Sequence, residues 1–210
     1  VNRALDGAPC KYPVEACLVF APTEGAFDNQ PENRVITKEE ALKILREAED
    51  AGLIHSTNNF QKGHYLICNC CTCCCGFMRG LYLFGVENSV AKSDFYATAD
   101  PKVCTGWGTC VERCQFGAPS LVDDISHVNQ KRCVGCGLCV MTCPSEAMTL
   151  VRKPEDQISP TPRNMEEWMK ERAENRGISL QEIERAKLNV PFLSNARARI
   201  FGRQKRREIS

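Results

Sequence analysis

The sequence predicts an α+β fold with three regions: a cysteine-rich, partly helical region over residues 1–93, a compact repeat over 94–152, and a helical extension over 153–210. Two observations carry this prediction. A stretch of the middle region repeats itself after 29 residues, and all 15 cysteines lie before its end. Beyond it the composition changes to charged residues with spaced prolines, which is typical of a linker followed by exposed helices.

The first predicted helix covers about residues 38–51. It follows a capping box, Thr37-Lys-Glu-Glu40, in which the threonine hydroxyl and the glutamate carboxylate satisfy free backbone N–H groups. Apolar side chains then recur at helical spacing, and Gly52 can adopt the left-handed conformation that ends a helix. We therefore expect this helix to lead the chain towards the cysteine-rich block.

That block holds six cysteines within eight residues, and two more lie near the start of the chain. Local disulfides are excluded, because a bridge needs facing side chains with Cα atoms about 4.4 to 6.8 Å apart. Dense thiolates favour zinc, copper(I) or iron–sulfur clusters. Individual cysteines could instead be buried as small apolar residues. The eight candidate ligands, enough for two four-cysteine sites, are Cys10, Cys17, Cys68, Cys70, Cys71, Cys73, Cys74 and Cys75.

The second copy of the repeat has the ligand spacing of a bacterial ferredoxin. It reads Cys133-x2-Cys136-x2-Cys139-x3-Cys143-Pro144. In two-cluster ferredoxins the fourth cysteine of such a run ligates the other cluster. A zinc ribbon would instead need two separated cysteine pairs. We therefore predict one complete 4Fe–4S site, here called the complete site, formed by Cys114, Cys133, Cys136 and Cys139.

The first copy lacks one ligand. The 29-residue register places Trp107 opposite Cys136, with no insertion or deletion. The three remaining thiols suit a cuboidal 3Fe–4S cluster, or a 4Fe–4S cluster whose odd iron takes a non-protein ligand. The alternative is an empty site whose space Trp107 fills as a core residue. This degenerate site consists of Cys104, Cys110 and Cys143.

Short apolar segments around the two runs predict a bacterial two-cluster ferredoxin module made of two strand–helix–strand halves. The helices are expected directly after Cys110 and Cys139. The outer strands are expected at residues 94–99 and 147–151, and the inner pair at 121–122 and 127–128.

The C-terminal extension predicts helices near residues 164–176 and 180–189, the second opened by Ser179-x-x-Glu182. The last stretch, Arg197 to Ser210, carries six basic residues and one acidic residue. It could be a solvated tail, dock on an acidic protein surface, or contact nucleic acid or anionic lipid.

Several function classes are disfavoured. The formal net charge of +1 gives no overall field for nucleic acid, and the longest apolar runs are too short to cross a bilayer. No glycine-rich dinucleotide fingerprint follows a strand, and no catalytic residue can be assigned. The chain begins without Met, so we expect an N-terminus that is processed or truncated.

Three motifs in one order carry a family resemblance: Cys10-x6-Cys17-Leu-Val-Phe, Ile67-Cys-Asn-Cys-Cys-x-Cys-Cys-Cys-Gly76, and the run from Cys104 to Pro144. This order, over roughly residues 5–155, resembles 4Fe-4S ferredoxin-type proteins of anaerobes and sulfur metabolism. The resemblance implies iron–sulfur cofactors and no particular substrate. Cys74-Cys75-Gly76 is also similar to the CCG motif of heterodisulfide reductase catalytic subunits.

We therefore expect a one-electron carrier in a larger, hetero-oligomeric redox complex, with redox proteins or flavoprotein subunits as electron donor and acceptor and no nucleic-acid partner. The expected location is cytoplasmic, free or peripheral on a membrane complex. One alternative is a reductive enzyme subunit with a catalytic cluster in the Cys68–Cys75 block and heterodisulfide-reductase-like thiol chemistry. Another is a redox or metal sensor.

Overall fold

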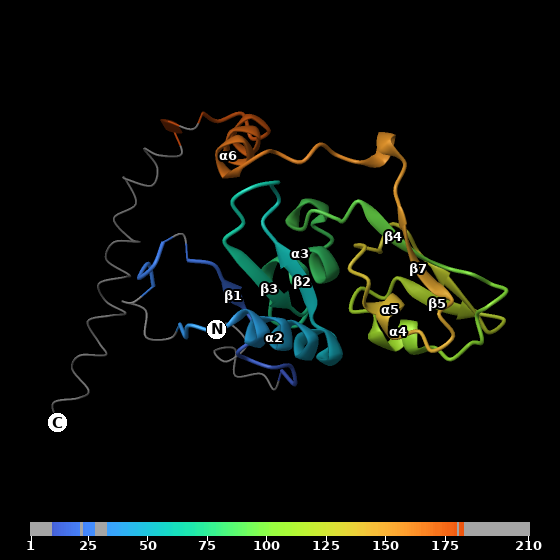
Figure 1. The fold of residues 1–210 in the computed structure, drawn as a ribbon. Helices are drawn as coiled ribbons and strands as arrows, with labels where there is room; N and C mark the ends of the chain where they lie inside the picture. The colour runs from blue at the N-terminus through green and yellow to red at the C-terminus, as the bar shows by residue number, and fades with distance from the viewer. Residues whose placement is uncertain (1–9, 22, 28–32, 180, 183–210) are drawn as a thin grey trace, which may run out of the picture. The chain divides into compact units, whose positions relative to one another are not determined.

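The computed structural model describes residues 10–21, 23–27, 33–179 and 181–182 of the chain. They form two compact units (Figure 1). The first contains the described residues up to Asn59 together with His64–Pro160, and the second contains Phe60–Gly63 together with those from Thr161 onward. No helix in the described part of the chain is both long enough and apolar enough to cross a membrane.

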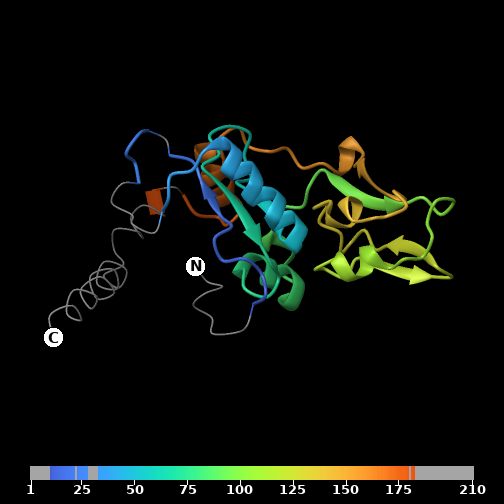
Figure 2. The ribbon, with the colours of Figure 1, turned by 60° about the horizontal axis from the view of Figure 1, so that its bottom comes forward.

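The first unit begins with a three-stranded antiparallel sheet in the order β1-β3-β2. Helix α2, Lys38–Ala51, precedes β2, and helix α3, Gly76–Phe84, follows β3. Both helices lie beside this sheet (Figure 2). The strands are β1 Leu18–Val19, β2 Ile54–Thr57 and β3 Leu66–Cys70.

The predicted helix at residues 38–51 is confirmed at both ends. Thr37 accepts a hydrogen bond from the backbone N–H of Glu40, whose carboxylate accepts one from the backbone N–H of Thr37. Gly52 ends the helix with a φ of 88°, in the left-handed region. Residues Leu53 and Ile54 then follow directly into the buried core.

The predicted strands and helices of the repeat are also confirmed. An outer antiparallel pair, β4 with β7, and an inner antiparallel pair, β5 with β6, accompany two short helices. Two 3-10 turns, η1 Glu87–Ser89 and η2 Glu155–Gln157, flank this part. The elements are β4 Phe95–Ala99, α4 Thr109–Arg113, β5 Pro119–Val122, β6 Ile125–Val128, α5 Leu138–Met141 and β7 Met148–Arg152.

The second unit is held together around helix α6, Met165–Glu174, which confirms the helix expected near 164–176. Asn164 caps its start, and the N–H of Gln61 donates to the carbonyl of Pro162 at 2.9 Å. The helix expected at 180–189 is described only at its first turn, where Ser179 caps Glu182. The rest of it, and the basic tail, lie outside the described residues.

Candidate metal-cluster sites

The two copies of the repeat fold in the same way around their first cysteines. The backbone N–H of Cys104 donates to the carbonyl of Asp100 at 3.0 Å, and 29 residues later the N–H of Cys133 donates to Asn129 at 3.0 Å. The inferred duplication therefore extends to the hydrogen bonds of the loops that carry the thiols.

The same correspondence reaches the sulfur atoms. Backbone N–H groups donate to ligand thiols, and such bonds favour the charged thiolate that a metal requires. Positions 97 and 126, which donate to the first cysteine of each copy, are again 29 residues apart. The bonds run from Ala97 to Cys133 at 3.5 Å, from Ser126 to Cys104 at 3.4 Å, and from Ala118 to Cys114 at 3.4 Å.

Glycine is required where each cysteine loop passes close to a neighbouring backbone. Gly135 has a φ of 71°, and a Cβ atom there would lie 2.2 Å from the carbonyl oxygen of Phe95. At the equivalent Gly106, with a φ of 72°, a Cβ atom would lie 2.9 Å from the carbonyl oxygen of Asp124. Neither distance is possible for a real side chain, so both loops depend on glycine.

The four thiols assigned to the complete site line one cavity. The rest of its lining is apolar or glycine, including Phe116 and Val134. Burial, followed by the neighbouring thiols of Cys136 and Cys114, raises the pKa of Cys139 to about 12. Four sulfur donors in an apolar, glycine-edged cavity are a donor set that fits a 4Fe–4S cluster. The four are Cys114, Cys133, Cys136 and Cys139.

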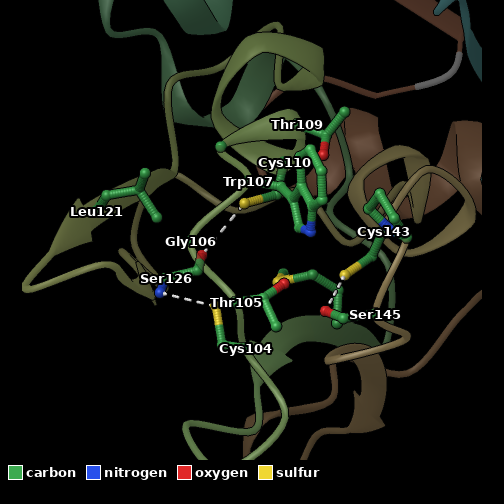
Figure 3. A pocket seen from close by; sticks show the side chains of 13 residues that line it. Cys104, Thr105, Gly106, Trp107, Thr109, Cys110, Leu121, Ser126, Cys143 and Ser145 are labelled. Carbon is green, nitrogen blue, oxygen red and sulfur yellow. Dashed lines mark hydrogen bonds between the residues drawn. The ribbon is translucent and has the colours of Figure 1, made fainter.

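The three thiols assigned to the degenerate site line a second cavity, shown in Figure 3. Trp107 borders this cavity and is 73% exposed, so its indole is not a core residue. The thiol of Cys143 lies 3.6 Å from the hydroxyl of Ser145. Burial opposes ionisation of Cys143, but hydrogen bonds from Ser145 and nearby backbone N–H groups lower its pKa overall.

Half of the eight N-terminal thiols gather into one group, here called the Cys10 set: Cys10, Cys71, Cys73 and Cys74. All their sulfur atoms lie within 4.8 Å of one another. The sulfur of Cys10 lies 3.3 Å from that of Cys73, which lies 3.2 Å from that of Cys71. Burial, followed by hydrogen bonds with the other three thiols, raises the pKa of Cys73.

The spacing of the Cys10 set is that of a single tetrahedral metal, since metal–sulfur bonds of about 2.3 Å place the sulfurs just under ~4 Å apart. Cys71 and Cys74 are buried, whereas Cys73 is exposed. The group thus has the donors and the access that a metal or cluster needs.

The other four N-terminal thiols, Cys17, Cys68, Cys70 and Cys75, also contact one another; we call them the Cys17 set. A hydrogen bond from the thiol of Cys68, assisted by one from the backbone of Asn69, lowers the pKa of Cys17 to about 6. The same Cys68 thiol, followed by burial, raises the pKa of Cys70 to about 11. A hydrogen bond with Cys70, followed by burial, raises the pKa of Cys75.

Two side chains that the sequence did not indicate join the cysteine block to the repeat. The side chain of Gln115 accepts a hydrogen bond from the N–H of Thr72 at 2.7 Å and donates one to the carbonyl of Gly52 at 2.5 Å. Arg113 donates to two carbonyls at the end of α2, each at 2.6 Å. The only signal was at position 115, where the first copy replaces the proline of the second.

Comparison with known families agrees with this geometry. A family model described as a 4Fe-4S binding domain matches residues 127–149, the segment that carries Cys133, Cys136, Cys139 and Cys143. No curated protein matches the chain. Together with the converging thiols of the Cys10 set, the match identifies an iron–sulfur protein.

Proposed function

We propose that this protein is a one-electron carrier that exchanges electrons with a redox protein or a flavoprotein subunit in a hetero-oligomeric complex. One observation supports this most directly. Cys110 and Cys139, assigned to different cluster sites, lie in one buried cluster, and Cys133 and Cys143 pack against it. When bound, iron–sulfur clusters supply one-electron oxidation and reduction. The protein's part is to hold the two ligand sets side by side and exclude water between them.

The degenerate site favours a carrier over an enzyme. Its cavity is lined by threonine, serine, glycine and apolar side chains besides the cysteines. No acidic or basic side chain occurs among the described residues that line it. A reductive enzyme that turns over a substrate needs a group that delivers protons to it. The lining therefore fits a site that holds a cluster, which we propose is of the 3Fe–4S type.

The test counts metals and electrons in the same sample. The full chain, purified without oxygen, is assayed for iron, acid-labile sulfide and zinc, and is then titrated with a one-electron reductant. We expect iron and sulfide, no zinc, and reversible uptake of one electron per cluster. Reduced protein should pass those electrons to an oxidised flavoprotein. Zinc in the N-terminal region, or clusters that never take up an electron reversibly, would contradict the proposal.

A further inference from the structure

The strand β3 separates the crowded cysteines into two groups. Side chains along a strand alternate between its faces, so Cys68 and Cys70 share one face and Asn69 occupies the other. Asn69 is buried on that other face, where its side chain meets Nδ1 of His55 at 2.5 Å and donates to the carbonyl of Ala16. The two thiols therefore cannot turn towards the side that Asn69 occupies.

Cys17 joins this face from the neighbouring strand. The register of β1 and β3 pairs Leu18 with Ile67, so Cys17 comes opposite Cys68 in the antiparallel arrangement. The thiols of these two residues are hydrogen-bonded, and the thiol of Cys68 also contacts that of Cys70. Three sulfurs thus follow one another across the surface of the sheet.

Cys75 reaches the same group through a turn. Its N–H donates to the carbonyl of Cys71 at 3.1 Å, which brings the chain back at the start of α3. Its sulfur contacts the thiol of Cys70 and accepts hydrogen bonds from the backbone N–H groups of Phe77 and Met78. The first turn of a helix stabilises negative charge, so this position suits a thiolate.

The packing keeps this group apart from the Cys10 set. Cys70 and Cys75 pack against a buried cluster that contains Ile54, Met78 and Phe116. Their sequence neighbours Cys71 and Cys74 instead belong to another buried cluster, with Ala16, Ala48 and Leu53, against which Cys10 packs. Adjacent cysteines therefore take part in different cores.

We propose that the Cys17 set, Cys17, Cys68, Cys70 and Cys75, is a second four-thiolate site that binds iron separately from the Cys10 set. It lies beside the complete site, because Cys114 packs against the same buried cluster as Cys70 and Cys75. The order of sites in the unit is then degenerate site, complete site, Cys17 set and Cys10 set. Only the use of this order for electron transfer rests on the proposed function.

Iron binding by these thiols releases their protons, since the thiolate is the ligand. The hydroxyl of Ser56 hydrogen-bonds to the thiol of Cys70 and is not a ligand in this arrangement. Ser56→Ala is therefore a matched control that removes a neighbour of the site without removing a donor.

The test is additivity of iron loss in the full chain. Cys68→Ala and Cys70→Ala should each remove the iron of one site, and the double variant should lose no more than either single variant. Cys70→Ala combined with Cys73→Ala should lose the sum of the two single losses, whereas Ser56→Ala should keep its iron. The retained EPR signal of the complete site shows that each variant has folded.

If the Cys70→Ala and Cys73→Ala losses do not add, all eight thiols serve one multinuclear site and the proposal is wrong. It is equally wrong if Cys68→Ala retains full iron. Where the strand variants do not fold, Cys17→Ala replaces them, because its side chain is exposed beside the sheet. Additive iron loss without reversible reduction would overturn the proposed electron transfer while leaving the second site intact.

Discussion

The repeat and the cysteine block collect their thiols in different ways. In the repeat, three ligands of a site lie on one loop and the first turn of a short helix, held by backbone hydrogen bonds over four residues, such as Cys133 to Asn129. In the block, Cys10 and Cys73 are 63 residues apart and meet only because the sheet brings them together. Spacing therefore specifies the sites of the repeat, while tertiary structure specifies those of the block.

Removing one ligand from the repeat should have the largest effect. Cys136→Ala should abolish the cluster of the complete site, about four iron atoms per chain, and destabilise the unit because cluster binding is coupled to folding. Iron analysis and reduced-state EPR measure this loss. Trp107→Ala, the same position in the other copy, is the matched control and should leave the iron content unchanged. Unchanged iron in Cys136→Ala would refute the assignment.

Loop geometry in the repeat should also be intolerant of change. Gly135→Ala places a Cβ atom against the carbonyl of Phe95 in a left-handed conformation, so we expect a loss of roughly 2 to 5 kcal/mol in the free energy of unfolding. Denaturant unfolding of the reconstituted chain measures it. Gly85→Ala has a φ of 65° and open space around it, and should cost only about 1 to 2 kcal/mol. Equal losses would show that steric contact at Gly135 is unimportant.

A smaller effect is expected where the two regions meet. Gln115→Ala leaves the N–H of Thr72 and the carbonyl of Gly52 without this partner in a half-buried setting, which should cost about 1 to 3 kcal/mol. Thermal unfolding should shift downward while iron content stays the same. Gln157→Ala, at an exposed 3-10 turn, is the control. Iron loss in Gln115→Ala would mean that this contact supports a cluster and not only the fold.

How far the sequence predicts the structure follows the same division. The capping box at Thr37 and the stop at Gly52 specify α2 because both act within one helical turn, and the structure gives Lys38–Ala51. The short strands of the repeat were also predictable from their apolar segments. The sheet β1-β3-β2 was not, because β3 carries cysteines and asparagine in place of a clear apolar alternation, and its partners are distant.

The division of the block into two sets also lay beyond the sequence. Cysteine is small enough to act as a core residue or as a ligand, so eight thiols gave a number of sites but no membership. Membership depends on Asn69, whose burial decides which face of β3 the thiols take. Similarly, a tryptophan in place of a ligand is compatible with a buried plug, and only the structure shows Trp107 to be exposed.

The last prediction concerns Trp107 and compares the two copies of the repeat directly. The degenerate site has three thiols around a cavity, and its open corner corresponds to Cys136 of the complete site. An indole cannot ligate iron, so the parent protein should show the oxidised-state EPR signal of a 3Fe–4S cluster. Trp107→Cys supplies the missing thiolate and, because the side chain at 107 is exposed, should do so without disturbing the core.

The expected gain is about one iron per chain, the difference between the two cluster types, with loss of the oxidised-state signal. Trp107→Ser, which also removes the indole but adds no thiol, should keep the parent signal and iron content. The altered cluster differs from its neighbour in charge and therefore in reduction potential, so the parent and Trp107→Cys should differ in the order in which their sites are reduced. No oxidised-state signal in the parent, with unchanged iron in Trp107→Cys, would instead mean that the repeat carries one cluster and that the three thiols bind none.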